Sequence, residues 1–228
     1  EDVALLADVL AGYDAADENS FAHPCPAMVK GVNADTPVDP IFAAFELPFD
    51  DRLSTDARAG FEEVLEALDD RVERHPSPPA FRSLLETQSI IHQYEFCQHL
   101  KVVLDEHWSQ LSETLKPIVE QGRRIGIDQY QHALGTRLEA KNYFDAFFID
   151  YDAILAPSAT GVAPLFGSGT GDPAYCTIWT LADLPCINTP LLVDGAGLPM
   201  GLQLIGAEQH DDRLLRTTNW LLRFLQSE

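Results

Sequence analysis

Two apolar stretches that flank a short turn, residues 185–193 and 200–205, constrain the fold of this chain more than any other part of its sequence. Residues 194–197 supply the turn. Apolar runs of this length, bounded by turn residues, are typical of buried β-strands. We therefore expect a buried strand pair whose side chains alternate, with Met200 on one side of the sheet and Gln203 on the other.

Strand and helix patterns alternate through the rest of the chain, which indicates an α/β fold. We expect a mixed β-sheet flanked by helices, with a mostly helical portion over residues 1–150 and the C-terminal strands and a helix over residues 151–228. Strands are expected at residues 41–47, 71–76 and 152–156, and amphipathic helices at 1–11, 54–68, 81–115, 127–148 and 214–225. The first helix is expected to be half buried. Residues 157–173 are too rich in glycine and proline for regular structure, and residues 13–39 should be extended with little packing.

The acidic composition limits the partners of this chain. Its formal net charge is −21, which repels nucleic acids and anionic membrane surfaces, and no basic patch compensates for it. The four cysteines form no paired motif, so we expect neither a zinc site nor a disulfide framework. No apolar run reaches the roughly 18 residues of a membrane span. We therefore expect a cytoplasmic protein that binds neither nucleic acid nor membrane.

Four stretches of the sequence carry a resemblance to a known family. They are EDVALLADVLAG at residues 1–12, YDAILAPS at 151–158, WTLADLP at 179–185 and GLPMGLQLIG at 197–206. In this order they resemble the C-terminal portion of the amidase signature family, the serine amidohydrolases that include bacterial amidases and the A subunit of tRNA-dependent amidotransferases. The last stretch matches the family's GLPxGLQLIG strand almost completely. The resemblance implies an amidase-signature-like fold of which this chain supplies the C-terminal half only.

Two departures from the family pattern matter for function. Asp183 stands where the family commonly has glycine, and its bulk predicts an altered turn. The family's catalysis uses a Ser-cis-Ser-Lys triad within a Gly/Ser-rich signature, and none of the four lysines here is near such a sequence. The run at residues 167–171 lacks a partner serine. We therefore expect no catalytic residue in this chain and no activity from the chain alone.

The resemblance implies a role in the complete enzyme. Its parent reaction would be amide hydrolysis or amide-nitrogen transfer through an acyl-serine, acting on a small-molecule amide. This chain would supply walls of the substrate pocket. The alternative is a non-catalytic binding or assembly module, because half a sheet exposes an apolar edge or face that favours a homo-oligomer or pairing with a missing half.

The loop at residues 166–172 is the first candidate for substrate contact, because the corresponding loop of the family borders the substrate pocket. Glycine-rich backbone around Ser168 and Gly169 can approach a ligand closely and offer N–H groups. A plain surface loop is the alternative. Asp172 falls where some amidotransferase-type members carry a substrate-facing aspartate, and a turn-initiating aspartate before Pro173 is its alternative.

Three further side chains are candidates for substrate binding. Arg124, beside Arg123, lies near the region where such family members place a carboxylate-binding arginine, although a surface arginine fits the same pattern. Tyr175 and Trp179 are four residues apart and either line an apolar pocket or belong to the core.

No metal or organic cofactor is implied by the sequence. His92, Glu95 and His99 share one helical face, but a metal site there would need further ligands, and neither His107 nor Cys97 is positioned in the sequence to supply one. Cys186 has no paired histidine motif, so we expect a small, buried, apolar residue and not a nucleophile.

Overall fold

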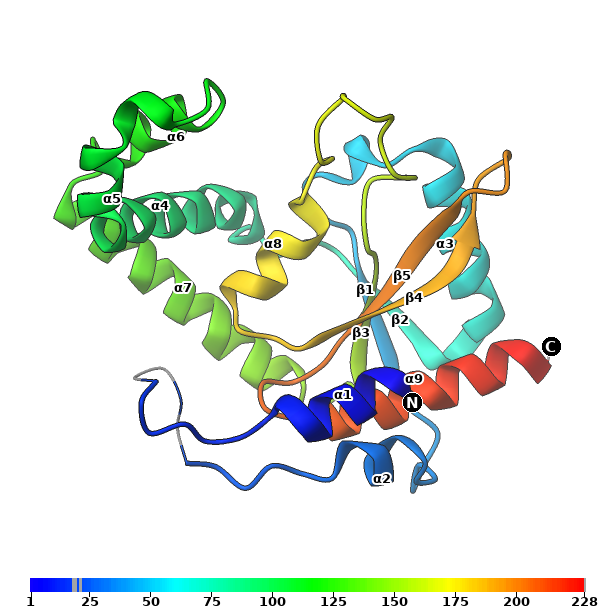
Figure 1. The fold of residues 1–228 in the computed structure, drawn as a ribbon. Coiled ribbons are helices and arrows are strands. Elements are labelled where there is room, and N and C mark those ends of the chain that lie inside the picture. The colour runs from blue at the N-terminus through cyan, green and yellow to red at the C-terminus, as the bar shows by residue number, and fades with distance from the viewer. Residues whose placement is uncertain (18–19, 21, 228) are drawn as a thin grey trace.

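The computed structural model describes residues 1–17, 20 and 22–227, and in this part of the chain five strands form one mixed sheet (Figure 1). The strand order is β2-β1-β3-β5-β4. The strands are β1 (Phe42–Phe45), β2 (Val72–His75), β3 (Ala153–Pro157), β4 (Cys186–Val193) and β5 (Pro199–Ile205). Strand β1 is parallel to both β2 and β3, whereas β5 is antiparallel to β3 and to β4. The predicted mixed α/β sheet is therefore confirmed.

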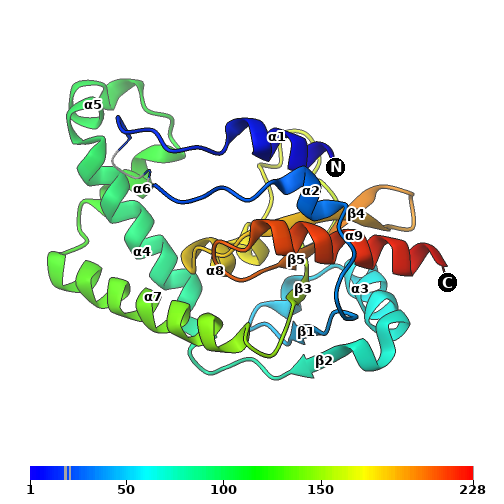
Figure 2. The same cartoon turned by 90° about the horizontal axis from the view of Figure 1, so that it is seen from below.

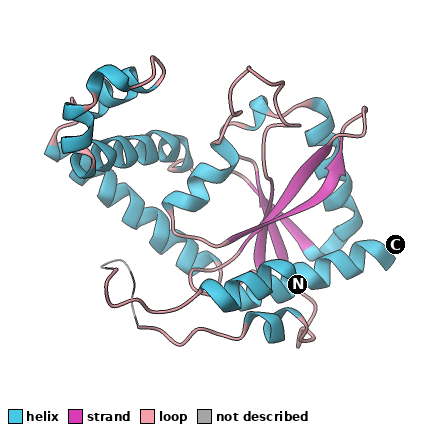
Figure 3. Ribbon diagram, in the orientation of Figure 1, coloured by secondary structure: helices cyan, strands magenta, loops and turns pink. Residues whose placement is uncertain are grey.

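Helices take up much of the remaining chain (Figure 3). They are α1 (Asp2–Leu10), α2 (Met28–Val32), α3 (Thr55–Leu68), α4 (Phe81–His99), α5 (Lys101–Glu106), α6 (Leu115–Gly122), α7 (Ile127–Phe147), α8 (Ala174–Leu181) and α9 (Asp211–Ser227). Helix α3 begins where the sequence predicts, because the Ser54 hydroxyl accepts a hydrogen bond from the backbone N–H of Ala57 at 3.1 Å. Residues 158–173 form the loop between β3 and α8, which confirms the absence of regular structure expected after Pro157.

The sheet is covered on both faces. Helices α3 and α9 pack on one face, and α4, α7 and α8 pack on the other. In β5, Leu202 and Leu204 face α3 and α9 while Ile205 faces the opposite layer, which confirms the predicted alternation. Helices α4 to α7 extend beyond the sheet as a separate arm, visible in both Figure 1 and Figure 2. We call these four helices the helical arm.

The strand pair that dominates the sequence is only half buried. Strand β5 is largely inaccessible to solvent, but within β4 only Thr189 and Leu192 are buried. The prediction of a fully buried pair is therefore wrong for β4. Its cause is the strand order, which places β4 at the edge of the sheet, where it hydrogen-bonds to β5 alone.

The N-terminal region differs from expectation in two ways. Helix α1 forms as predicted, but Val9 and Leu10 are 74% and 79% exposed, and Ala4 is its one buried residue. Residues 13–39, expected to pack little, contain α2, whose Met28 and Val32 are buried. Helices α1 and α2 are joined, because the carboxylate of Asp8 on α1 accepts hydrogen bonds from the first backbone N–H groups of α2.

The turn into β4 is built around Asp183, which has a left-handed backbone with a φ of 58°. This conformation favours glycine, the residue expected from the resemblance. Arg137 and Lys141 on α7 both contact the Asp183 carboxylate, and Lys141 also contacts Glu208. Asp183 thus adopts the backbone of a glycine while it anchors two cations.

Candidate functional site

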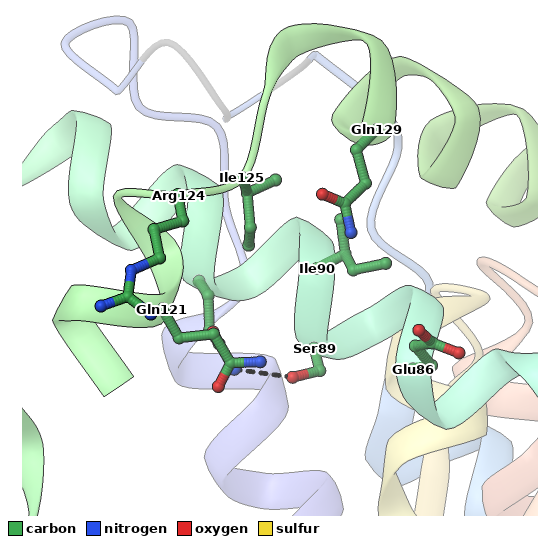
Figure 4. A pocket seen from close by; sticks show the side chains of 8 residues that line it. Glu86, Ser89, Ile90, Gln121, Arg124, Ile125 and Gln129 are labelled. Carbon is green, nitrogen blue, oxygen red and sulfur yellow. Dashed lines mark hydrogen bonds between the residues drawn. The ribbon is translucent and has the colours of Figure 1, made fainter. Parts of the chain in front are cut away.

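The helical arm contains a cavity of about 190 Å³ (Figure 4). Its walls come from α4, from α6 and the turn that follows it, and from the first turn of α7. The lining residues are Glu86, Ser89, Ile90, Gln93, Gln121, Arg124, Ile125 and Gln129. Two isoleucines among polar side chains give a small site that can hold both the apolar and the polar atoms of a ligand.

Arg124 brings an uncompensated positive charge to this cavity. Among the described residues its guanidinium makes no hydrogen bond or ion pair, and the same holds for the carboxylate of Glu86 across the cavity (Figure 4). Neighbouring Arg123 differs, since it pairs with Asp105 and lies 5.1 Å above the Trp108 ring. Arg124 is therefore the arginine of the two that is available to an anionic or carbonyl group.

Gln93 supplies an acceptor to the same cavity. Its amide nitrogen donates a hydrogen bond to the Ser89 hydroxyl at 2.8 Å, while its amide oxygen is buried without a partner. A buried polar atom without a partner costs free energy unless a ligand or water satisfies it. An N–H group of a ligand would complete the hydrogen bonding of Gln93. Arg124 and Gln93 together suit a molecule that carries a carboxylate or carbonyl and an N–H.

Ser168 and Gly169 lie in the exposed part of the loop between β3 and α8. Gly167, Gly169 and Gly171 all have left-handed backbone, with φ values of 89°, 99° and 90°. This conformation turns the chain repeatedly and leaves backbone groups facing solvent. The loop and Arg124 do not share a cavity, because none of the predicted loop residues lines the site in the helical arm. Substrate contact by Ser168 and Gly169 stays a prediction.

Asp172 holds the end of this loop against the body of the protein. One carboxylate oxygen accepts a hydrogen bond from the Ala174 N–H at the start of α8, and the other pairs with Arg52 at 3.0 Å. Both oxygens thus have partners within the chain. The turn-initiating role that the sequence offers as an alternative is consistent with these contacts, and a substrate contact stays a prediction.

Tyr175 and Trp179 project from α8 into the core, where they are 0% and 1% exposed. The Tyr175 hydroxyl hydrogen-bonds to Asp50, and burial followed by the neighbouring Asp50 raises the pKa of Tyr175. Burial likewise raises the pKa of Asp50, although the bonds from Tyr175 and the Leu47 N–H oppose this. In this chain both aromatic residues therefore lie in the core, which is the second of the two positions that their spacing in the sequence allows.

Within the described residues no lysine side chain hydrogen-bonds to a serine hydroxyl. Lys141, Lys101 and Lys116 pair with carboxylates instead. Likewise, no group of three or more histidine, cysteine or acidic residues in the described part of the chain is placed to hold a metal ion. Glu95, one of the three residues considered as ligands, accepts a hydrogen bond from Tyr130 at 2.7 Å.

The exposure of Cys186 differs from the prediction. The residue is exposed at the start of the edge strand β4, so the prediction that it is buried is wrong. Partial desolvation, followed by the effect of Cys176, nevertheless raises the pKa of the Cys186 thiol to about 12. A thiol with such a pKa is a poor nucleophile at neutral pH.

Several lining residues of the cavity were not predicted from the sequence. Glu86, Ser89, Ile90 and Gln93 lie three, four and seven residues apart, so they share one face of α4. Polar residues on a face that packs against another helix were the available signal.

In the described part of the chain no helix is long and apolar enough to cross a membrane.

Known proteins share both the sequence pattern and the fold of this chain. The family model described as Amidase matches residues 1–215. The A subunit of glutamyl-tRNA(Gln) amidotransferase from Aliarcobacter butzleri is 26% identical in an alignment 250 residues long. This alignment covers 94% of this chain and 53% of that protein. The protein of the same name from Lachnospira eligens is 38% identical over 94 residues, covering 38% of this chain and 20% of that protein.

Solved structures agree on the fold. The structure of 6-aminohexanoate cyclic dimer hydrolase complexed with substrate matches with a TM-score of 0.77 at 18% identity, covering 98% of this chain and 53% of that chain. A structure from a vestigial protein complex related to the origins of an s-triazine catabolic enzyme matches with a TM-score of 0.83 at 21% identity, covering 96% and 50%. The chain thus spans about half the length of the relatives that it matches from end to end.

Proposed function

This chain belongs to the amidase family, and from that premise we propose that it is the C-terminal part of a serine amidohydrolase, which contributes walls of the substrate pocket but not the nucleophile. The complete enzyme would hydrolyse an amide, or transfer its nitrogen, through an acyl-serine intermediate. The pairing of Lys116 and Lys141 with carboxylates, and not with serine hydroxyls, supports the view that the nucleophile comes from elsewhere.

The main observation behind this proposal is that Arg124 and Gln93 line the same cavity. Arg124 offers N–H donors that form no ion pair with a carboxylate of the described residues, and the unpartnered oxygen of Gln93 offers an acceptor. An amide whose acyl part ends in a carboxylate satisfies both, because its carboxylate pairs with the guanidinium and its N–H reaches the glutamine. We therefore expect the substrate to be a small amide that carries a negative charge.

Binding of succinamate to the 228-residue chain tests this assignment, since the acyl part of this amide ends in a carboxylate and its amide nitrogen offers N–H groups. Isothermal titration should show about tenfold weaker binding for Arg124→Gln and a similar loss for Gln93→Leu. Arg123→Gln is the matched control and should bind like the parent chain. Equal losses in Arg123→Gln and Arg124→Gln, with unchanged thermal unfolding, would contradict the assignment.

Activity provides the second test. The purified chain should not hydrolyse simple amides, and co-expression with an amidase segment that carries the lysine and the paired serines should restore hydrolysis. Hydrolysis by the chain alone, abolished by a serine-directed reagent, would overturn the proposal that the nucleophile lies elsewhere.

An assembly module is the second candidate function, and the exposed apolar side chains favour it. Val9 and Leu10 on α1 and Val193 on the edge strand β4 are all more than half exposed. Such surfaces suit a homo-oligomer or a second polypeptide. Light scattering distinguishes the two candidate functions, because a dimer that dissociates in Val9→Lys would support assembly and a monomer at high concentration would contradict it.

A further inference from the structure

A second cavity lies where the chain reverses its direction of winding across the sheet. Strand β1 connects through α3 to β2, which lies on one side of β1 in the sheet. Strand β2 then connects through the helical arm to β3, which lies on the other side of β1. Helix α3 covers one face of the sheet and the helical arm contributes to the opposite face (Figure 1). In open α/β sheets, ligands bind outside the carboxyl ends of the strands at such a point.

This cavity has a volume of about 370 Å³ and opens at the carboxyl ends of β1 and β3, between the sheet and α3. Its volume is within the range of small-molecule sites. Leu53, Phe61 and Leu65 provide apolar walls, and Pro157 at the end of β3 also contributes. We call it the switch-point pocket. Its walls can bury an apolar group about the size of a phenyl ring.

Two arginines border this pocket from different elements. Arg58 on α3 donates one hydrogen bond to the backbone carbonyl of Asp50, and its other donors have no partner among the described residues. Arg74 on β2 pairs with Glu62 on α3 at 2.6 Å. Arg58 is therefore ready to bind an anion, while Arg74 could bind one only in competition with Glu62.

Among the described residues no acidic side chain of the pocket forms an ion pair with Arg58, although the charge of Arg58 acts on Asp50 and opposes the rise of its pKa. Both carboxylate oxygens of Asp50 have partners, in the Tyr175 hydroxyl and the Leu47 N–H. Glu62 is held by Arg74, and within the described residues the Glu46 carboxylate forms no ion pair with either arginine. The remaining donors of Arg58 are thus unsatisfied hydrogen-bonding groups beside the apolar walls.

We propose that the switch-point pocket binds a small organic carboxylate, with the carboxylate on Arg58 and an apolar body against Leu53, Phe61 and Leu65. The guanidinium of an arginine matches a carboxylate geometrically, and the apolar walls exclude water from the pair. This site is separate from the cavity that contains Arg124, because the two share no lining residue. The proposal therefore stands independently of the amide site.

The probe for this site is 3-phenylpropionate, titrated into the 228-residue chain by isothermal titration or ligand-observed NMR. Its neutral amide should bind at least tenfold more weakly, and 3-phenylpropylamine should not bind more tightly than the acid. Tighter binding of the amine would overturn the proposal, since it would show that Glu46 or Glu62 dominates the pocket.

Single-residue variants locate the binding. Arg58→Gln should weaken 3-phenylpropionate about tenfold, while Arg58→Lys should retain part of the affinity because it keeps the charge. Glu62→Gln should strengthen binding severalfold, since it frees Arg74. Arg123→Gln should leave the affinity unchanged, because Arg123 pairs with Asp105 and lines neither cavity. Loss of binding in Arg124→Gln with none in Arg58→Gln would place the acid in the helical arm and overturn the proposal.

Discussion

The Arg137 guanidinium reaches both carboxylate oxygens of Asp183, with its Nη2 at 2.7 and 2.6 Å, while Asp183 has a φ of 58°. Arg137 also donates from Nε to the carbonyl of Leu181 at 3.0 Å. One side chain of α7 therefore holds the last turn of α8 and the residue that leads into β4. Desolvation opposes ionisation here, but hydrogen bonds from Lys141 and Arg137 outweigh it and lower the pKa of Asp183.

Substitution of Asp183 separates the backbone contribution from that of the ion pair. Asp183→Ala loses the ion pair and keeps a left-handed backbone, so we expect a loss of about 1–2 kcal/mol in the free energy of unfolding. Asp183→Gly loses the same ion pair but tolerates this backbone, so it should be about 1 kcal/mol more stable than Asp183→Ala. Urea unfolding of both variants measures the difference. Equal stability would show that the backbone conformation contributes nothing.

Tyr175→Phe tests the buried hydrogen bond to Asp50. We expect a loss of about 1–3 kcal/mol in stability at pH 7, because the ionised Asp50 loses one of its two donors. The loss should shrink at low pH. Since burial raises the folded-state pKa of Asp50, its protonated form favours folding, and this contribution is present below its unfolded pKa and disappears as pH rises through the folded pKa.

The measurement for this prediction is urea unfolding of the parent chain and Tyr175→Phe at pH 4 and pH 7. Tyr13→Phe is the control, since Tyr13 is 58% exposed and should change stability by less than about 0.5 kcal/mol. A larger loss for Tyr175→Phe at pH 4 than at pH 7 would contradict the proposed dependence on Asp50.

Gly201 in β5 should tolerate no side chain. A Cβ atom there would collide with the Asn188 amide oxygen and the Ser158 hydroxyl, which hydrogen-bond to each other beside it. Gly201→Ala should therefore lose about 1–3 kcal/mol of stability. Gly135→Ala on α7 is the control, because no atom lies within 4 Å of its added Cβ, and it should gain up to about 1 kcal/mol. Thermal unfolding that ranks the two variants in the opposite order would refute this account.

The cysteines should react with iodoacetamide at different rates at pH 8. Cys25 is exposed and should be modified first. Burial raises the pKa of Cys176 and of Cys97, and the pKa of Cys186 is about 12, so little thiolate forms at these positions. Peptide mass spectrometry after timed quenching reports the order, and urea should remove the differences. Fast modification of Cys186 in the folded chain would contradict the raised pKa.

Much of this fold follows from local sequence patterns, and the failures have physical causes. Helices α3, α7 and α9 were predictable because each repeats apolar residues over three or more turns. The single helix expected over residues 81–115 is wrong, because the helix breaks at Leu100 and forms α4 and the separate α5. Helix α2 has five residues, which is too short for a periodic signal. The exposure of β4 could not be predicted because it depends on the strand order, which a single strand's sequence does not contain.

The candidate site was predicted in part. Arg124 was identified through the family resemblance, but its cavity forms only when α4 packs against α6 and α7, which brings Gln93 and Gln121 together from distant positions. The interior position of Tyr175 and Trp179 was one of the two alternatives that their spacing allowed. Which alternative holds depends on the layer that covers α8, and that layer comes from other parts of the chain.

The strand order also divides the molecule into two segments that assemble at different times. Strands β1 and β2 are joined through α3, and β4 and β5 through a short turn, so each pair forms from nearby residues. The seam between β1 and β3 is different: the Ile41 N–H bonds to the Asp152 carboxylate across 111 residues. Closing so long a loop is slow and entropically costly. We therefore expect this seam to close after the two strand pairs during folding.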